Sequence, residues 1–404
     1  MYFDVEIKVL RIHYNLDLRG GAENHILKIM TAMYERFKTE KHLMLISKEM
    51  GAYNLCYFST DVNRIIKASS ISSLKCLIET YIKEYCINII HIHSMPFPQV
   101  TNLLFEFGLP VFRSLHEPMI TCPGWSRFLE RSCKPCSKNF GPLCLINAYT
   151  EKCQRSRKPE NIVSAYLNVY YEQNKFIKKY FNLIVYSDYM LNLLLNHGVL
   201  RSKILKVPSP QKSILTTPIQ TKSGIPDLVF VGRISKQKGI FDLIEAYREI
   251  VKYYPSLRLK IIGDGDFKHQ FEESVEQALL KNIQLLGWQK REDIFNRFAS
   301  DCVVVVPSIY PDNFPNVVAE AMLNGAPVVA SNSGGTSEWF IDGESGISYE
   351  KGNINQLVKK IVELIESPSK RAKIGIAAKD RIERFHSYDK AADRYAEVYS
   401  RALT

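Results

Sequence analysis

The sequence predicts an α/β protein built from two similar halves, and three observations support this. Short apolar segments alternate with segments of helical periodicity, the pattern of a parallel sheet covered by helices on both faces. The alternation stops at residues 208–226, where four prolines stand among Ser, Thr and Lys, and then restarts. The length of 404 residues suits two domains, each able to bury its own core.

The first half shows six strand-like and four helix-like segments around one irregular stretch. Strands are expected at Lys8–Tyr14, Leu43–Ser47, Ile87–Ile92, Val111–Leu115, Leu183–Ser187 and Ile204–Val207. Helices are expected at Ala22–Phe37, Ser73–Tyr85, Asn161–Tyr180 and Asp188–Asn196. Residues 117–158 are rich in Cys, Pro, Lys and Arg without a clear period, so we expect a functional or anchored insertion there.

The second half repeats the alternation and ends in a separate helix. Strands are expected at Asp227–Val231, Arg258–Ile262, Ile283–Leu286, Val303–Val306 and Pro327–Ala330. Helices are expected at Ile240–Tyr253, Phe267–Leu280, Val317–Asn324, Asn355–Glu366, residues 370–384 and Ser387–Leu403. We therefore divide the chain into an N-terminal domain at 1–210, a linker at 211–226, a second domain at 227–386 and a final helix at 387–404.

Charge is uneven along the chain. Residues 1–210 hold 27 basic and 17 acidic residues, whereas residues 211–404 hold 26 and 25. A basic half favours an anionic partner such as a membrane surface, a lipid phosphate, an acidic glycan or nucleic acid; a solvated basic surface without a partner is the alternative. No nucleic-acid-binding motif is present, so nucleic acid is not expected.

Targeting signals are not evident in the sequence. No segment reaches the roughly 18 apolar residues that a spanning helix needs. The first ten residues lack a basic flank, an apolar run and a cleavage site. We therefore expect a cytoplasmic protein, with peripheral attachment to the inner face of the membrane.

Candidate anion-binding residues follow the first strand of the second half. Gly232 and Arg233 end that strand, and Lys238 precedes the next helix. Two cations beside a helix N-terminus suit a diphosphate by charge, hydrogen bonding and dipole. A basic loop without a ligand would have the same sequence.

Two carboxylates form a second candidate cluster. Asp312 lies in a loop before a helix, and Glu320 follows eight positions later, about two turns into that helix. Carboxylates at these places can accept hydrogen bonds from sugar or ribose hydroxyls. The alternative is a capping Asp and an ordinary Glu on the core side of the helix.

These residues belong to an ordered set of motifs that resembles the retaining family-4 glycosyltransferases, also called glycosyltransferase group 1. The motifs span nearly the whole chain: Gly20-Gly21-Ala22-Glu23, His91-Ile92-His93, His116-Glu117, Val231-Gly232-Arg233 with Lys238-Gly239, Ile262-Gly263-Asp264-Gly265, Asp312-x7-Glu320, Glu320-Ala-Met-Leu-Asn-Gly325-Ala-Pro327-Val and Gly334-Gly335-x-x-Glu338. The resemblance implies two Rossmann-like domains facing each other across a cleft (the GT-B fold), with the C-terminal helix crossing back to the N-terminal domain.

The resemblance also implies roles for individual residues. Arg233 and Lys238 neutralise the donor diphosphate, Glu320 holds the ribose, Asp312 holds the donor sugar, and His116 contacts the sugar near its anomeric carbon. The segment from Trp288 to Lys290 contacts the base. The nucleotide-binding set implied is Gly20, Gly21, Gly232, Arg233, Lys238, Lys290, Asn313, Phe314, Pro315, Asn316 and Glu320, and the catalytic set is His116, Arg233, Lys238, Asp312 and Glu320.

The implied reaction is sugar transfer from a nucleotide-diphosphate donor, UDP rather than GDP, to a glycan or lipid-linked glycan in polysaccharide or lipopolysaccharide assembly. It retains the anomeric configuration by same-face attack and needs no divalent metal. The sequence departs from the family at three places: Asp312 replaces the usual Glu, Pro315 the usual Gly, and Glu117 the commoner Asp. Alternatives are an epimerase or phosphorylase of the same fold, or a non-catalytic scaffold.

Two further patterns suggest metal sites. Asp264-Gly265-Asp266 resembles an Asp-x-Asp site, but a turn at a strand end is the favoured interpretation, and His91 and His93 are interpreted as structural. Five of nine cysteines fall within 122–153, and Cys122, Cys133, Cys136 and Cys144 include one C-x2-C that could hold structural zinc. Free thiols are the alternative, because standing disulfides are not expected in a reducing cytoplasm.

Overall fold

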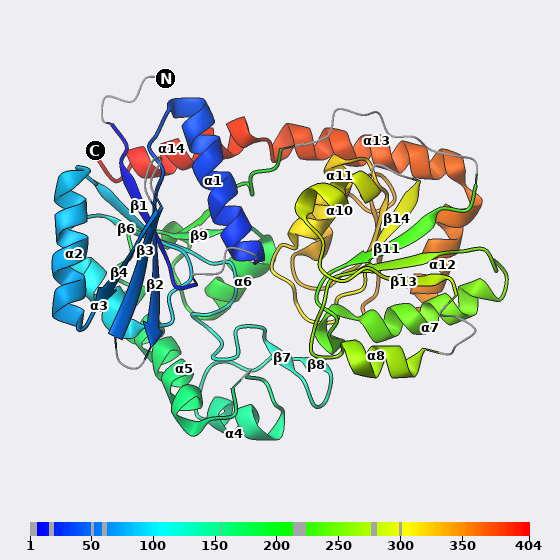
Figure 1. Ribbon diagram of the computed structural model, residues 1–404, viewed down its shortest axis with the longest axis horizontal. Helices are drawn as coiled ribbons and strands as arrows, with labels where there is room; N and C mark the ends of the chain where they lie inside the picture. The colour runs from blue at the N-terminus through cyan, green and yellow to red at the C-terminus, as the bar shows by residue number, and fades with distance from the viewer. Residues whose placement is uncertain are drawn as a thin grey trace. The chain divides into compact units, whose positions relative to one another are not determined.

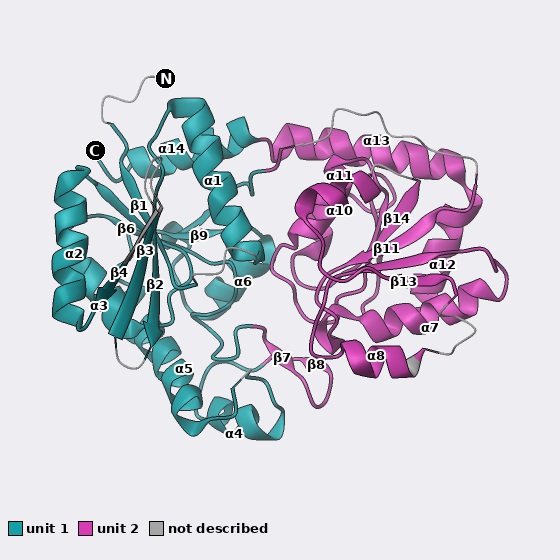
Figure 2. Ribbon diagram, in the orientation of Figure 1, with its two compact units in different colours: residues 1–125, 138–210, 388–404 teal, residues 126–137, 211–387 magenta. Residues whose placement is uncertain are grey.

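The computed structural model describes residues 6–15, 20–49, 52–58, 63–154, 156–212, 224–275, 281–298 and 301–404. The chain divides into two compact units (Figure 2). Unit 1 comprises Met1–Trp125, Lys138–Pro210 and Tyr388–Thr404, and unit 2 comprises Ser126–Ser137 and Gln211–Ser387. Most of the linker expected at 211–226 lies outside the described residues, which omit 213–223.

Unit 1 is built on an eight-stranded sheet of order β10-β9-β6-β5-β1-β2-β3-β4 (Figure 1). The six parallel strands are β1 (Val9–His13), β2 (His42–Glu49), β5 (Ile89–Ile92), β6 (Val111–Ser114), β9 (Leu183–Val185) and β10 (Ile204–Lys206). Two strands without a predicted counterpart, β3 (Ala52–Phe58) and β4 (Asn63–Ala68), add an antiparallel edge. The central strands β1 and β5 are fully buried, as apolar parallel strands require.

Helices cover both faces of this sheet. The helices of unit 1 are α1 (Gly21–Phe37), α2 (Ile71–Glu84), α3 (Pro98–Phe105), α4 (Leu143–Thr150), α5 (Pro159–Tyr171), α6 (Asp188–Asn196) and α14 (Tyr388–Ser400), with a 3-10 turn η2 (Arg201–Lys203). A capping box of Ser70 and Ser73 starts α2. The predicted helix at 161–180 is α5, continued by a π-helical turn η1 (Glu172–Phe176).

The final helix, α14, belongs to unit 1 and packs against α1 (Figure 1). Tyr395 and Tyr399 are completely buried, and Asp393 forms an exposed ion pair with Arg36 of α1. The residues from Tyr388 to Thr404 are therefore part of unit 1, although residues 211–387 separate them from it in the sequence.

The insertion at 117–158 is divided between the units. A short hairpin of β7 (Phe128–Leu129) and β8 (Lys134–Pro135) groups with unit 2, whereas α4 packs on α5 in unit 1. The whole insertion was expected in the N-terminal domain, but residues 126–137 group with unit 2.

Unit 2 contains a six-stranded sheet of order β13-β12-β11-β14-β15-β16, in which all pairs are parallel. The strands are β11 (Asp227–Val231), β12 (Leu259–Ile262), β13 (Ile283–Leu285), β14 (Cys302–Val306), β15 (Val328–Ser331) and β16 (Ile347–Tyr349). The helices are η3 (Lys236–Lys238), α7 (Ile240–Val251), α8 (Lys268–Ser274), α10 (Arg291–Phe298), α11 (Asn316–Leu323), η4 (Thr336–Trp339), α12 (Ile354–Glu366) and α13 (Pro368–Phe385). In the described part of the chain, no helix is long and apolar enough to cross a bilayer.

Candidate functional site

The strand order of unit 2 marks one place on its sheet as a binding site. The chain winds outward from β11 through β12 to β13, then returns to β14 on the other side of β11 and winds outward through β15 to β16. The loops after β11 and β14 therefore lead to opposite sides of the sheet from the carboxyl ends of neighbouring strands, the place where open α/β sheets bind their ligands. These two loops carry Gly232, Arg233 and Lys238, and residues 307–316.

Glycines let the loop after β11 pack closely on its neighbours. A Cβ atom at Gly263 would lie 2.0 Å from the Gly232 carbonyl oxygen, and one at Gly239 would lie 1.8 Å from the Pro307 carbonyl oxygen. Gly239 also has a φ of +69° and is the N-cap of α7, so its backbone conformation and its surroundings both require glycine. The start of α7 is thereby fixed against the loop after β14.

Cationic groups stand beside this helix start. The Arg233 side chain is exposed, and Lys238 is half-buried. The Lys238 ammonium donates to Asp312 Oδ2 at 2.5 Å and to the Tyr310 hydroxyl at 3.2 Å. Burial opposes the charged form of Lys238, but Asp312 and Tyr310 outweigh it and raise its pKa, so the residue stays an ammonium ion.

The backbone of the loop after β14 is held from two sides. Gln237 accepts hydrogen bonds from the amides of Ile309 and Tyr310, and Gly335 donates its amide to the Asp312 carbonyl at 2.7 Å. A Cβ atom at Gly334 would lie 2.2 Å from that same carbonyl oxygen. The motif Gly334-Gly335 therefore lets the chain after β15 support the Asp312 backbone, and Asp312 is a buried residue with 8% exposure.

The segment from Asn313 to Asn316 leads into α11. Phe314 stacks on Trp339 with ring centroids 3.7 Å apart, so this side chain anchors the loop in the core. Pro315 is the N-cap of α11, and Asn316 accepts from Gln211 Nε2 at 3.2 Å. With proline at 315 the loop has no amide donor at that position.

Glu320 lies in the second turn of α11 and is bound by a residue that the sequence analysis missed. Its Oε1 accepts from Arg291 Nε of α10 at 3.1 Å, and both side chains are less than one-third exposed. Lys290, one position earlier, is exposed, as is Trp288 at 59%. Arg291 had no motif to mark it, because its partner comes from a separate helix.

Unit 1 has the corresponding switch point between β1 and β5. The loop after β1 leads to Gly20, the N-cap of α1, followed by Gly21. A Cβ atom at Gly20 would lie 2.0 Å from Glu23 Oε2, so Gly20 lies directly against this carboxylate. Glu23 accepts from His13 Nε2 at 3.0 Å and from Asn15 at 2.8 Å. Burial by itself would raise the pKa of the Glu23 carboxyl, but these hydrogen bonds outweigh burial and lower it.

A chain of histidine rings lies next to that loop. His91 stacks on His93, His93 Nδ1 lies 3.0 Å from His116 Nε2, and the His116 ring contacts His25 of α1. Burial lowers the pKa of all four histidines. His116 alone among the four is not fully enclosed, being half-buried. It can therefore present a neutral imidazole to a ligand, and the others orient it.

The structure does not bring the four cysteines of the predicted zinc site together. Among the described residues, which include all nine cysteines, no group of three or more His, Cys, Asp or Glu side chains could hold a metal ion, and no disulfide forms. Cys133 and Cys136 lie on the hairpin grouped with unit 2, whereas Cys122 and Cys144 belong to unit 1. The zinc prediction is therefore corrected: the C-x2-C spacing here belongs to a hairpin.

The Asp-x-Asp pattern is a turn. The Asp264 carbonyl accepts the amide of Ile234, and the Gly265 amide donates to the Asp264 side chain at 2.9 Å. A Cβ atom at Gly265 would lie 2.5 Å from the Ile234 carbonyl oxygen. This segment therefore supports the loop that carries Arg233.

Comparison with known proteins agrees with this geometry. Residues 217–381 match the family model described as glycosyl transferases group 1. The matched residues include the β11 and β14 loops and the helices that follow them.

Similar proteins include two whose names refer to surface glycan synthesis. The chain is 31% identical over 154 residues to the capsular polysaccharide biosynthesis glycosyltransferase CapM of Staphylococcus aureus, covering 38% of this chain and 40% of that protein. It is 27% identical over 179 residues to a lipopolysaccharide 1,2-N-acetylglucosaminetransferase of Salmonella typhimurium, covering 42% and 47%. An uncharacterised glycosyltransferase of Methanocaldococcus jannaschii is 34% identical over 171 residues, again 42% and 47%. The matched part thus spans less than half the length of each relative.

Solved structures extend the likeness to the whole chain. HepE of Anabaena in complex with UDP superimposes with a TM-score of 0.67 at 18% identity, covering 98% of this chain and all of that one. TarM superimposes with a TM-score of 0.69 at 15% identity, covering 99% and 100%. At these identities the likeness shows the fold alone, and the fold is that of the GT-B glycosyltransferases, with two Rossmann-like units.

Proposed function

We propose that this protein is a retaining glycosyltransferase that moves a sugar from a nucleotide-diphosphate donor to a glycan or lipid-linked glycan acceptor. The observation that carries the proposal is the switch point of unit 2. There the segment between β11 and α7 carries an exposed guanidinium and an ammonium held charged by Asp312, and it leads into the N-terminus of α7. This arrangement suits a diphosphate.

Each residue of unit 2 has a role in the proposal. Arg233 and Lys238 bind the diphosphate and stabilise the charge that develops as it leaves, so no divalent metal is required. Glu320, oriented by Arg291, accepts from the ribose hydroxyls. Gly232 lets the nucleotide approach the backbone, and Lys290, which is exposed, is assigned to contact the base.

Asp312 has two partners in turn. In the structure its carboxylate is paired with Lys238. A diphosphate competes for the Lys238 ammonium, and we propose that the carboxylate then accepts from the donor sugar hydroxyls, together with the backbone of residues 313–316. The carboxylate is one methylene shorter than the Glu usual in the family, so its reach toward the sugar is shorter. The replacement of Glu by Asp at position 312 should therefore affect mainly which donor sugar binds.

The proposed chemistry is same-face attack on the anomeric carbon. The acceptor hydroxyl forms the new bond as the bond to the diphosphate breaks, and the leaving diphosphate takes the hydroxyl proton. His116 contributes a neutral imidazole to the sugar, and the loop at Gly20 and Gly21 lets the backbone of unit 1 approach the donor. UDP is favoured over GDP because similar structures such as HepE hold UDP or UDP-glucose.

Unit 1 supplies the acceptor side. Its excess of basic residues favours an anionic acceptor or membrane surface. Among the relatives, CapM and the Salmonella transferase are named for capsular polysaccharide and lipopolysaccharide, which supports a role in assembling a cell-surface glycan on the cytoplasmic face of the membrane.

A thermal-shift screen tests the donor site. We expect one family of nucleotide diphosphates, uridine before guanosine, to raise the melting temperature of the protein, and Arg233→Ala to abolish the shift. Lys359→Ala, which removes an exposed cation from α12, is the matched control and should keep the shift. If no nucleotide shifts the melting temperature, a non-catalytic scaffold is favoured instead.

Product analysis separates the remaining alternatives. Donor consumption without any acceptor would indicate an epimerase, and consumption that depends on inorganic phosphate would indicate a phosphorylase. Transfer with inversion at the anomeric carbon would contradict the retaining mechanism.

A further inference from the structure

Helices α4 and α5 of unit 1 expose an unusual amount of apolar surface. Among the described residues, eighteen large apolar side chains are exposed, and seven of them lie on these two helices. They are Leu143 (54% exposed), Ile146 (56%) and Tyr149 (50%) on α4, and Val163 (48%), Leu167 (43%), Tyr170 (48%) and Tyr171 (40%) on α5. We call these seven residues the α4–α5 surface.

The spacing of the seven residues places them along one face of each helix. On α4 they recur every three positions, and on α5 they follow at intervals of four, three and one. The two helices pack on each other at the end of unit 1 (Figure 1), and Phe140 contacts Tyr166 at 4.7 Å between ring centroids. Single exposed apolar residues are ordinary, but such a cluster marks an interaction site.

Exposed cations stand at both ends of helix α5. Arg157 and Lys158 are exposed just before α5, and Lys175, Lys178 and Lys179 are exposed just after it. Residues 138–180 contain eight basic and three acidic residues, and one of these acids, Glu172, is completely buried. The surface therefore combines apolar and tyrosine side chains with a rim of cations.

We propose that the α4–α5 surface lies on an anionic phospholipid bilayer. Aliphatic side chains would enter the boundary between headgroups and acyl chains, tyrosines would lie at headgroup level, and the cations would pair with lipid phosphates. A second copy of this chain fits less well, because a symmetric contact would bring the same cations together. The charge of the rim thus selects the bilayer over a second copy.

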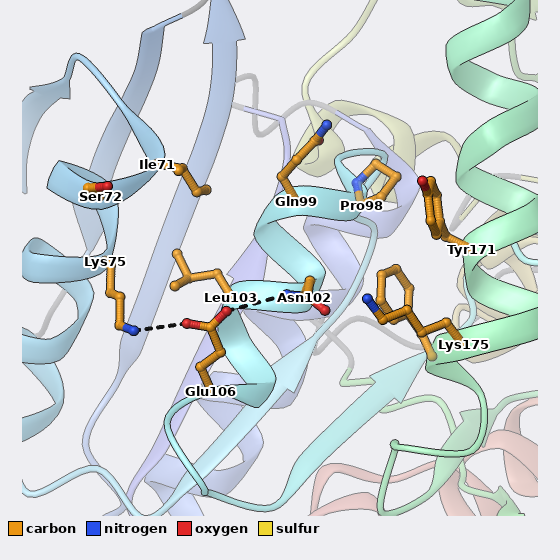
Figure 3. Close-up of a pocket in the computed structure, with 11 residues that line it drawn as sticks. Ile71, Ser72, Lys75, Pro98, Gln99, Asn102, Leu103, Glu106, Tyr171 and Lys175 are labelled. Carbon is orange, nitrogen blue, oxygen red and sulfur yellow. Dashed lines mark hydrogen bonds and ion pairs between the residues drawn. The ribbon is translucent and has the colours of Figure 1, made fainter.

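A groove next to the α4–α5 surface is also lined by a tyrosine and a lysine. It has a volume of about 510 Å³ and lies between α2, α3 and the end of α5 (Figure 3). Tyr171 and Lys175 reach into it from one side, opposite Pro98 and Asn102 of α3. Tyr171 belongs to both the groove and the α4–α5 surface, so a headgroup that contacts the surface can also reach the Lys175 ammonium.

This proposal rests on the proposed function: binding to the bilayer would bring the protein to a lipid-linked acceptor. It is tested without donor or acceptor, so the two can fail separately. A protein that binds vesicles but no nucleotide would sink only the proposed function, and the converse would sink only this inference.

Vesicle co-sedimentation of the purified full chain is the experiment. We expect the protein to bind vesicles of phosphatidylcholine with phosphatidylglycerol about tenfold or more tightly than vesicles of phosphatidylcholine alone, and raised salt to weaken the binding. The double variant Ile146→Ser/Leu167→Ser should reduce the affinity about tenfold. The matched double variant Leu200→Ser/Ile376→Ser removes two aliphatic side chains, exposed by 69% and 67%, outside the surface and should bind as the parent does.

A variant that changes charge provides a second test in case the apolar variant does not fold. Lys178→Glu/Lys179→Glu should weaken binding to anionic vesicles and leave thermal stability unchanged. The inference is overturned if the parent does not bind anionic vesicles, or if the control variant loses as much binding as the surface variants. It is also overturned if light scattering shows a dimer that Ile146→Ser/Leu167→Ser converts to a monomer, because a second copy would then cover the surface.

Discussion

Acidification should destabilise unit 1 before unit 2, because four connected histidines of unit 1 are held neutral. Burial lowers the pKa of His25 to about 3 from its usual 6.5, and lowers those of His91, His93 and His116 well below 6.5. In the unfolded chain these groups titrate near 6.5. Below that pH the unfolded state binds more protons than the folded state. Stability is therefore fully present above about pH 7 and is lost as the pH falls through 6.5.

The size of the effect follows from the pKa of His25. A group that titrates near 6.5 when unfolded and near 3 when folded loses about 2 kcal/mol of stabilisation between pH 7.5 and pH 5. The pKa values of His91, His93 and His116 are lowered in the same direction, so these groups add to the loss. Unit 1 should therefore lose stability before unit 2 as the pH falls from 7.5 to 5.

Hydrogen exchange measures the two units separately. After correction for the intrinsic pH dependence of exchange, protection of the β5 amides should fall between pH 7.5 and pH 5, while that of the β14 amides changes little. His25→Gln keeps an acceptor for the Ser209 hydroxyl and should reduce the slope by about 1.4 kcal/mol per pH unit. The reasoning is refuted if β5 keeps its protection at pH 5, or if β14 loses as much.

Four further predictions concern the site and the cysteines. Asp312→Asn should lower the free energy of unfolding of unit 2 by about 2 kcal/mol, because it leaves a half-buried ammonium without its carboxylate; urea denaturation that matches the parent would show that the pair contributes nothing. Gly239→Ala should cost about 3 kcal/mol or more, because Cβ meets a carbonyl oxygen, whereas Gly352→Ala, with φ of +75° and open space, should cost about 1 kcal/mol; equal melting temperatures for the two variants would contradict this. Glu320→Gln should weaken UMP and UDP binding alike, about tenfold by calorimetry, and Arg233→Ala should weaken UDP alone; an equal loss of UMP binding in both variants would argue against the diphosphate role. A chelator should leave the melting temperature unchanged, since the structure gathers no zinc ligands among its described residues; a large fall would restore the zinc hypothesis.

The fold was predictable wherever a segment was apolar enough to carry a period. The helix at Asp188–Asn196 and the strand at Asp227–Val231 have the predicted bounds, because an N-cap serine and a buried run of apolar residues mark them. Helix α10 (Arg291–Phe298) was missed because only Phe295 and Phe298 are buried in a polar segment. Strands β3 and β4 were missed because polar residues interrupt them and their pairing is set by neighbouring strands.

The site was predictable as a set of loops and less so as a set of contacts. Glycine and charge patterns mark the loops at Arg233, Asp312 and Gly20, since close backbone approach and anion binding restrict residue type there. The partners that orient the site come from distant elements. Arg291 beside Glu320, and Trp339 under Phe314, follow from tertiary packing, which no local pattern encodes.

The cysteines also show that spacing in the sequence does not determine which side chains meet in the structure. A C-x2-C spacing is compatible with a metal site but does not fix where the remaining ligands lie. Here Cys133 and Cys136 flank strand β8 of a short hairpin, and the other cysteines of the insertion group with unit 1. Spacing alone could not distinguish these arrangements.

The most direct test of the account is a crystal structure of the protein with UDP. The account predicts the diphosphate at the switch point between β11 and β14, with its oxygens within hydrogen-bonding distance of Arg233 and Lys238, and the ribose against Glu320. UDP bound elsewhere in unit 2, or a diphosphate that contacts neither cation, would contradict it.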